Sequence, residues 1–405
     1  MFTLPTRVAR TPARRVSRPL YAYATLEEFV LLYPFYAVLF ADTGLSVAQI
    51  TSLFVIWSAT AIVLEVPSGA LADIVSRRLL LACAPIFAAT AFALWLIFPS
   101  YWSFAFGFVL WGAGGTLSSG ALEALVYTEL DTRGAAQQYA RIMGVARSCG
   151  VVAVGVSTVI AVPVMALGGY AAIGAASVLV CLMCAASALL LPETRTAATS
   201  DIETEPAYFR TLSEGLREIR QSRPVLAAVA LAAVVPALWE SLEEYVPLLA
   251  VEDGVRVELV PWVVLVIWIG VAAGGLCAGA GARLHNRSLA VLVAAGAGLM
   301  ALGALAGSPF GWIALGAAFG VFQMTSVVAD ARLQHRITGP SRATVTSVAG
   351  LGTGLLTVAA FLAYAGLFSF SGHAWVFVLF ALPYLFIAVA MAAPRAGYRG
   401  TARHP

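Results

Sequence analysis

The sequence has no lysine and little charge of any kind. Only 11% of its 405 residues are charged, all 24 basic residues are arginine, and 60% of the chain is hydrophobic. Soluble domains carry about 25% charged residues, so this composition excludes an ordinary soluble enzyme. Disorder is excluded as well, because it needs low hydrophobicity and high net charge. What remains is a protein that crosses a bilayer many times.

The sequence also lacks the familiar motifs of enzyme and metal chemistry. There is no P-loop, no G-x-S-x-G, no H-E-x-x-H and no zinc-ligand spacing. Cys181 and Cys184 form a C-x-x-C, but they lie in an apolar run without a nearby histidine. We interpret them as small apolar fillers. We therefore expect that the protein is not an enzyme and that it holds no metal and no cofactor. We expect a proton gradient to be its energy source.

Apolar runs of about 20 residues, the length of a membrane-crossing helix, number twelve. They cover 20–41, 46–72, 79–98, 103–127, 140–164, 169–191, 225–249, 259–281, 288–307, 310–329, 343–367 and 374–393. We therefore expect an all-α integral membrane protein. Its partners should be the lipid bilayer and a small-molecule substrate, and we expect no nucleic acid. Oligomeric state leaves no trace in the sequence, and we expect a monomer by default.

The arginines predict how the chain crosses the bilayer. Twenty-two of the 24 lie in the N-terminal segment, in alternate connections or in the tail; only Arg256 lies in an opposite connection, and Arg147 lies inside a span. Cytoplasmic loops carry the excess of basic residues, so both termini should be cytoplasmic and the number of spans even. We expect a multi-pass protein of the inner (plasma) membrane.

The longest polar segment, 192–224, divides the spans six and six. It separates an expected bundle at 20–191 from one at 225–393, with a basic segment at 1–19 and a tail at 394–405. In its second part Phe209, Leu212, Leu216 and Ile219 have helical spacing. They predict an amphipathic helix, either on the membrane surface or solvated.

The two halves resemble each other weakly, as expected of parallel repeats related by a pseudo-two-fold axis along the membrane normal. VIW occurs at 55–57 and again 211 residues later, GALADIVSRR at 69–78 aligns with 279–288, and Glu123 falls opposite Asp330. TLEEF at 25–29 and SLEEY at 241–245 are 216 residues apart, out of register by six. We interpret this last match as chance, which places the two glutamate pairs at different depths.

A charged motif follows the second span, in Glu65-Val-Pro-Ser-Gly69-Ala-Leu71-Ala-Asp73-Ile-Val-Ser-Arg77-Arg78. Gly69 would let helices approach closely. Asp73 at the boundary would meet a helix N-terminus or an arginine. Together with Leu71, Arg77 and Arg78, these residues predict a conformational latch between helices at the cytoplasmic face.

This stretch resembles the G-x-L-a-D-r-x-G-r-[RK] signature of the major facilitator superfamily, although Ile74 and Ser76 depart from it. LPET at 191–194 is also similar to the family. The resemblance implies two six-helix bundles around a central cavity that opens alternately to each side. It further implies that spans 1 and 7 line this cavity, and that the latch helps hold the outward-facing state.

Ionisable residues inside spans cost about 2.5–3.5 kcal/mol each at the bilayer centre, so we treat them as functional candidates. Glu27 and Glu28 are neighbours about 100° apart on a helix, so one of them should face the cavity. Glu240, Glu243 and Glu244 share one face of span 7. Carboxylates so close in a low dielectric cannot all ionise, and at least one should take up a proton. The alternative is a stripe that faces a water-filled vestibule.

The other intramembrane charges are Glu123, Asp330 and Arg147. Either Glu123 pairs with Arg147, which would neutralise both, or Arg147 snorkels to the surface. Glu129 and Asp131 end span 4 near the inner arginines and predict salt bridges there. Four tryptophans either line a cavity or pack between helices: Trp57, Trp111, Trp239 and Trp268. Glycine clusters at 112–115, 274–281 and 350–354 predict close helix contacts.

The net intramembrane charge is acidic, which favours a cationic substrate or protons. The sequence looks like the twelve-helix drug:proton antiporter branch, although the G-x-x-x-G-P pattern of span 5 is missing. We expect a secondary transporter with alternating access that exports hydrophobic or cationic drug-like molecules by proton antiport. The alternatives are an importer or facilitator of a small metabolite and, in another class, a membrane sensor or scaffold that does not transport.

Overall fold

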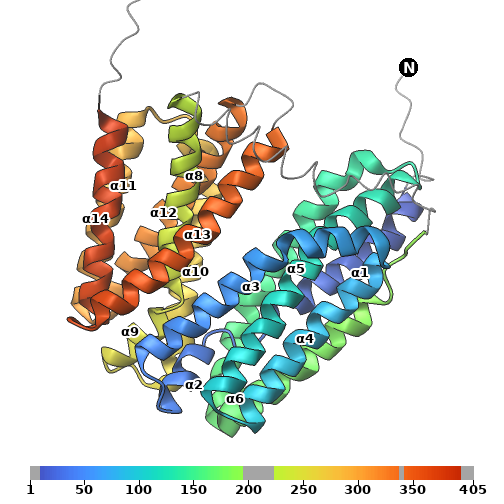
Figure 1. The fold of residues 1–405 in the computed structure, drawn as a ribbon, viewed down its shortest axis with the longest axis horizontal. Coiled ribbons are helices and arrows are strands. Elements are labelled where there is room, and N and C mark those ends of the chain that lie inside the picture. The colour runs from blue at the N-terminus through green and yellow to red at the C-terminus, as the bar shows by residue number, and fades with distance from the viewer. Residues whose placement is uncertain (1–9, 195–222, 337–341, 394–405) are drawn as a thin grey trace, which may run out of the picture.

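The computed structural model describes residues 10–194, 223–336 and 342–393, and these are almost entirely helical (Figure 1). The predicted amphipathic helix at 209–219 lies outside the described residues. The first half contains α1 (Arg10–Glu28), α2 (Tyr36–Asp42), α3 (Val47–Ile74), α4 (Arg77–Ile97), α5 (Tyr101–Asp131) and α6 (Tyr139–Ala188). The second contains α8 (Arg223–Glu243), α9 (Val246–Glu252), α10 (Val260–Gly281), α11 (Asn286–Ala306), α12 (Pro309–Arg336), α13 (Arg342–Phe368) and α14 (His373–Ala392).

Nine helices in the described part of the chain are long and apolar enough to cross a membrane. Large apolar side chains such as Leu276 and Phe310 are more than four-fifths exposed, as expected of a surface that faces lipid. One of the nine, α6, has 50 residues, and its backbone leaves the helical conformation at Gly169, with φ 59° and ψ −156°. Only glycine adopts this conformation readily. The expected spans 140–164 and 169–191 therefore lie within one element, on either side of Gly169.

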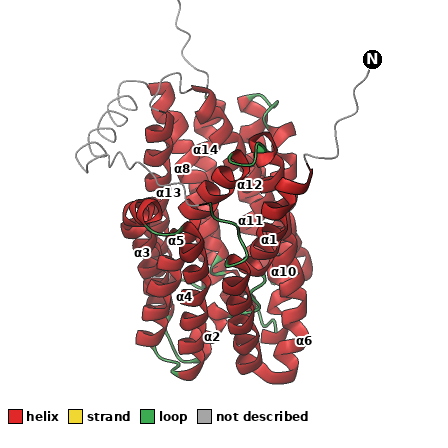
Figure 2. Cartoon of the chain, turned by 90° about the vertical axis from the view of Figure 1, so that its right-hand side faces the viewer, coloured by secondary structure: helices red, strands yellow, loops and turns green. Residues whose placement is uncertain are grey.

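The helices form two groups, α1–α6 and α8–α14, which meet at one end and diverge at the other (Figure 1). We call these the sealed end, where α2 and α9 lie, and the open end, where α1 begins and α14 finishes. Seen from the side, most helices of both groups run in the same direction (Figure 2). Contacts between the groups join α3 to α13, α6 to α10 and α2 to α9. In the internal repeat α3 corresponds to α10, and the start of α6 corresponds to α13. The contact between α3 and α13 is therefore the repeat equivalent of the contact between α10 and α6.

The buried apolar side chains follow the same division. At the sealed end one cluster runs through both groups and includes Phe54 of α3 and Tyr245 of the second half. Toward the open end each group has its own core, built around Leu81 and Leu125 in the first and around Leu333 and Val345 in the second. The two groups are thus independently packed bodies that share a core only at the sealed end.

The first helix of each half is broken, so the prediction of continuous helices over 20–41 and 225–249 was wrong. Residues 29–35 separate α1 from α2, and residues 244–245 separate α8 from α9. Pro34 lies in the first break, and proline disfavours a helical residue before it. The buried N–H of Leu32, freed from helical bonding, donates to Ser177 Oγ at 3.1 Å. Backbone that leaves the helix in the membrane needs such a partner.

These breaks correct our interpretation of TLEEF and SLEEY as a chance match. Both glutamate pairs come where the first helix of their half ends: Glu28 is the last residue of α1, and Glu243 is the last residue of α8, with Glu244 the first residue of the break. The elements that follow, α2 and α9, are each seven residues long and lie 210 residues apart, in register with the rest of the repeat. Seven residues separate Glu28 from α2 but only Tyr245 separates Glu244 from α9. The six extra residues of the first break account for the shifted register.

Candidate functional site: an acidic and aromatic cavity

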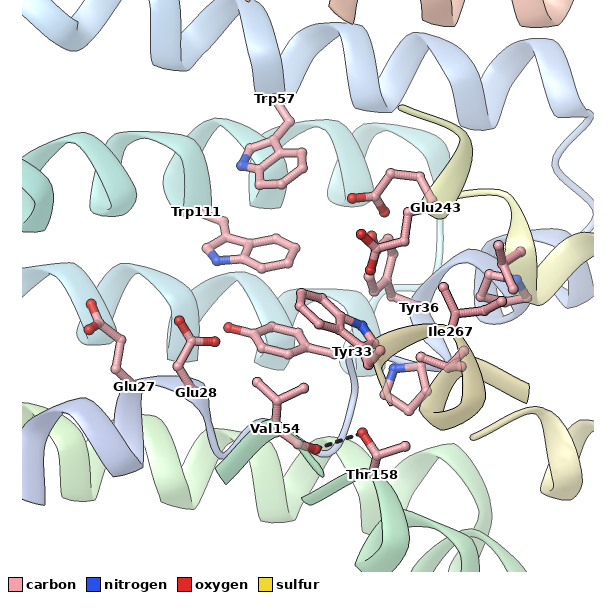
Figure 3. Close-up of a pocket in the computed structure, with 16 residues that line it drawn as sticks. Glu27, Glu28, Tyr33, Tyr36, Trp57, Trp111, Val154, Thr158, Glu243 and Ile267 are labelled. Atoms are coloured by element: carbon pink, nitrogen blue, oxygen red, sulfur yellow. Dashed lines mark hydrogen bonds between the residues drawn. The ribbon is translucent and has the colours of Figure 1, made fainter. Parts of the chain in front are cut away.

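A cavity of about 370 Å³ lies between the two groups at the level of both helix breaks (Figure 3). The first group contributes Glu27, Glu28, Tyr33, Tyr36, Trp57 and Trp111 to its wall. The second contributes Glu243, Glu244, Val264, Ile267 and Trp268. Each half therefore supplies its glutamate pair and the tryptophan of its VIW repeat to one shared space.

The four carboxylates lie where a helix ends. The last carbonyl groups of α1 and α8 have no helical partner, and a helix C-terminus carries about half a negative charge. Tyr23 Oη donates to Glu27 Oε1 at 3.2 Å. Glu28, Glu243 and Glu244 make no hydrogen bond or ion pair with any other described residue. Since no described residue that lines the cavity is basic, its potential is negative unless protons or a cation neutralise it.

The structure differs from the helical-spacing predictions at both acidic clusters. Glu27 and Glu28 both line the cavity, where the spacing predicted one. Glu240 is exposed and does not line it. Of the predicted stripe on span 7, only Glu243 and Glu244 line the cavity; α8 ends at Glu243, so Glu244 belongs to the break and not to the helical face.

A stack of three aromatic rings forms one wall of the cavity. Tyr33 stacks on Trp111 with ring centroids 5.6 Å apart, and Trp111 stacks on Trp57 at 5.1 Å. Trp268 lines the cavity from the other half, whereas Trp239 is buried and its Nε1 donates to Ser326 Oγ at 3.3 Å. Sequence reasoning missed Tyr33. The available signal was its place before Pro34, which takes it out of the helix and into the break.

Buried aromatic residues close the cavity toward the sealed end. Thr51 Oγ1 of α3 and Tyr245 Oη are 2.7 Å apart, a buried hydrogen bond between the two halves. Phe54 packs edge-on against the same tyrosine at 5.5 Å. Within the second half Tyr245 stacks on Tyr364, whose hydroxyl bonds to His373 Nδ1. Tyr245 follows Glu244 directly, so this seal is continuous with the acidic wall.

The charged residues predicted for spans 4, 5 and 10 lie away from this cavity. Arg147 Nη2 donates to Glu123 Oε1 at 3.0 Å, and both side chains are more than half exposed. The predicted ion pair therefore forms, on α5 and α6. Asp330 is exposed on α12. None of the three lines the cavity.

The residues of the predicted latch make their described contacts inside the first half. Arg77 Nη1 donates to Thr128 Oγ1 of α5 at 3.2 Å, and its Nε to Ala72 O at 3.3 Å. Leu71 is partly exposed, and Arg78 Nε is buried without a hydrogen-bond partner in the described part of the chain. Asp73 belongs to α3, and its side chain lies outside the description. The predicted close approach at Gly69 is not seen among the described residues, since a Cβ there would meet none of their atoms within 4 Å outside its own helix backbone.

Two glutamates near the open end hold the first half together. Glu193, in the LPET stretch, accepts from the Arg77 backbone N–H at 2.7 Å and from Ser76 Oγ, at the N-terminus of α4. Glu129 is buried; it pairs with Arg133 and accepts from the backbone N–H of Thr194. The salt bridge predicted for Glu129 therefore forms. Both glutamates tie the segment after α6 to the other helices of its half.

The described residues offer nothing to hold a metal, since no group of three or more His, Cys, Asp or Glu side chains among them is suitably placed. Two packed helical groups, apolar outer surfaces and a polar cavity at their junction define a membrane transport protein. The sequence matches the family model of the Major Facilitator Superfamily over residues 21–328. The chain belongs to this superfamily.

Solved structures show the same fold at low sequence identity. The nucleoside transporter NupG is 11% identical and superposes with a TM-score of 0.74, covering 95% of this chain and 100% of its own. A bacterial homologue of the human lysosomal transporter Spinster, crystallised inward-facing and unoccupied, is 13% identical, with a TM-score of 0.64 and coverages of 96% and 97%. No curated protein sequence matches this one.

Proposed function

We propose that this protein is a proton-coupled secondary transporter that exports hydrophobic or cationic small molecules by alternating access. The observation that carries the proposal is the shared cavity, with two glutamate pairs, an aromatic wall and no basic residue among the residues that line it. Burying a charge without a partner is costly. Carboxylates in such a place favour either bound protons or a bound cation, and exchanging one for the other is antiport.

The proposal extends to the arrangement in the membrane. Counting α6 as two passes on either side of Gly169, and each broken helix as one, gives twelve passes through the inner membrane with both termini in the cytoplasm. The basic connections would then lie at the open end, and the conformation described here would be inward-facing. The protein would work as a monomer, with the hydrogen bond between Thr51 and Tyr245 sealing the outer side.

One alternative has an observation in its favour. The fold is shared with the nucleoside transporter NupG, and the stacked Tyr33, Trp111 and Trp57 offer a flat surface on which a base could lie. In an importer of this kind the carboxylates would accept hydrogen bonds from substrate hydroxyl and amino groups. Import of a nucleoside and export of a cation predict opposite dependence on the proton gradient and different substrates.

The test is proton movement in proteoliposomes that hold a pH gradient, recorded while lipophilic cations, neutral drugs and nucleosides are added in turn. Glu28→Gln and Glu243→Gln each remove one cavity carboxylate. Glu65→Gln, an exposed residue of α3 outside the cavity, is the matched control. We expect cations to trigger proton release with the wild type and the control, and each cavity variant to abolish it.

Two results would contradict the proposal. Nucleoside uptake without any response to cations would make the protein an importer. Cation transport without proton movement would make it a facilitator whose glutamates bind substrate only.

A further inference from the structure

We propose that the cavity binds organic dications, with one cationic group held by each half of the protein. This inference rests on the proposed function and narrows its substrate class. The cavity wall is symmetric, because both halves break their first helix at a glutamate pair.

The repeat makes two equivalent poles. The first consists of Glu27 and Glu28 at the end of α1, with Trp57 of the VIW repeat in the same half. The second consists of Glu243 and Glu244 at the end of α8, with Trp268. Carboxylates and aromatic ring faces that line one cavity are the surroundings that organic ammonium groups prefer, because a ring face attracts the cation as well. The negative end of each helix dipole adds to the negative potential.

The space between the poles is aromatic. In Figure 3 the rings of Tyr33 and Trp111 lie between the Glu27–Glu28 pair and Glu243. These rings stack at 5.6 Å and offer no formal charge along the way. A ligand that reaches both poles therefore needs a flat or apolar body, with its cationic groups at the two ends.

Charge balance also favours two cationic groups. A monocation can neutralise carboxylates at one pole only, and the other pole then depends on protons. A dication neutralises both poles in one binding event, and the cost of ordering the second group is reduced because the first has already localised the ligand. The inference therefore predicts that a dication binds with higher affinity than a monocation of the same shape.

The experiment uses two probes with the same body. One is a biphenyl with a trimethylammonium-methyl group at each end; the other has an uncharged tert-butyl group in place of one trimethylammonium. Affinities are measured by calorimetry on the purified full-length protein in detergent. We expect the dication to bind about ten- to hundredfold more tightly, the range of one additional charged contact. It should also displace more protons, measured in buffers of different ionisation enthalpy.

Variants locate the effect. Neutralising the first pole (Glu27→Gln with Glu28→Gln) or the second (Glu243→Gln with Glu244→Gln) should lower the affinity ratio of the two probes to about one. Glu65→Gln with Glu258→Gln removes two carboxylates outside the cavity and should leave the ratio unchanged. The monocation, which can use either pole, reports that each variant is folded.

The outcomes separate this inference from the proposed function. Equal affinity of the two probes for the wild type, or a ratio that depends on one pole alone, would overturn the dication site and leave cation transport standing. If neither probe binds and no cation moves protons in liposomes, the proposed function fails, and the dication site with it.

Discussion

The two halves share one plan but pack their central helices by different means. In the second half α10 and α12 touch backbone to backbone, since a Cβ at Gly270 or Gly274 would collide with the carbonyl oxygen of Gly316 or Gly320. In the first half, the equivalent helices α3 and α5 approach less closely, and a tryptophan ring takes part in the contact: a Cβ at Gly112 would lie 3.1 Å from both Trp57 Cδ1 and the Trp57 carbonyl oxygen. The same pair of helices thus makes a closer glycine contact in the second half and a wider one, shared with a tryptophan ring, in the first.

This difference indicates that the two halves have different roles in binding and in movement. The aromatic packing of the first half continues into the cavity as the stack of Tyr33, Trp111 and Trp57. The glycine contacts of the second half bring α10 and α12 into direct backbone contact. We infer that the first half supplies most of the surface on which a ligand lies, while the second moves as a rigid body against it.

The largest effect is expected from breaking the glycine contact. Gly274→Ala places a methyl group onto the Gly320 carbonyl and forces α10 away from α12. Overpacking of this kind costs about 1–3 kcal/mol, which for a chain of 405 residues corresponds to a fall of about 1–4 °C in unfolding temperature. Thermal unfolding of the purified protein in detergent measures it.

The neighbouring Gly275 is the control, because a Cβ there would meet no atom within 4 Å. Gly275→Ala should leave the unfolding temperature unchanged or raise it slightly, since alanine is the better helix former. Equal losses at both positions would mean that the contact between α10 and α12 is not the reason for the effect.

The next effect tests the aromatic wall of the first half. Trp111→Leu removes the central ring of the stack and should weaken binding of a lipophilic monocation about tenfold, within the range of a desolvated cation–π contact. Trp102→Leu, at a side chain of the same helix that is 78% exposed, should change nothing. Unaltered affinity in Trp111→Leu would mean that the aromatic stack of the first half is not the surface on which the ligand lies.

These differences between the halves limit what the sequence could reveal. Apolar runs predicted the helical membrane protein, because burial in lipid constrains composition directly. The run Phe29–Tyr36 stays apolar through the first break, so hydropathy could not detect it, and only Pro34 and the preceding glutamates marked the place. The six extra residues then disguised a true repeat as chance. Contacts such as that of Glu193 with the N-terminus of α4 join distant segments and leave no periodic signal.

A smaller effect is expected where the halves meet. Tyr245→Phe keeps the aromatic packing but removes the hydrogen bond with Thr51, and a buried bond contributes about 1 kcal/mol. The outward-open population should rise about fivefold. A single cysteine placed near Thr51 in a cysteine-free background would report this as faster labelling by an impermeant thiol reagent from the sealed side.

Tyr384→Phe is the matched control, because Tyr384 Oη donates to Val235 O at 3.0 Å within the second half. It removes a buried hydrogen bond of similar length without touching the junction. It should lower stability but leave the labelling rate unchanged. Faster labelling in both variants would show general loosening instead of a seal between the halves.

The smallest effect compares the ends of α2 and α9, which the repeat makes equivalent. After α2, Thr43 Oγ1 donates to Phe40 O at 2.8 Å and to Leu39 O at 3.1 Å. After α9 the same position is Asp253, whose Oδ2 is buried with no hydrogen-bond partner among the described residues. A carboxylate at a helix C-terminus opposes the helix dipole. We expect Asp253→Thr to raise the unfolding temperature by up to about 1 °C, and Thr43→Asp to lower it by at least as much.

The pH dependence of Asp253→Thr separates charge from hydrogen bonding. Partial burial, and then the neighbouring charge of Glu252, raise the pKa of Asp253 above its ordinary value of 3.8. The ionised form therefore costs stability at every pH above the raised pKa, and the cost disappears below the ordinary value. The advantage of threonine should be largest near about pH 7 and should shrink toward about pH 4 as the wild type takes up its proton. An advantage that stays constant over this range would come from the hydroxyl's hydrogen bonds alone, and the two halves would then differ at this position in capping but not in electrostatics.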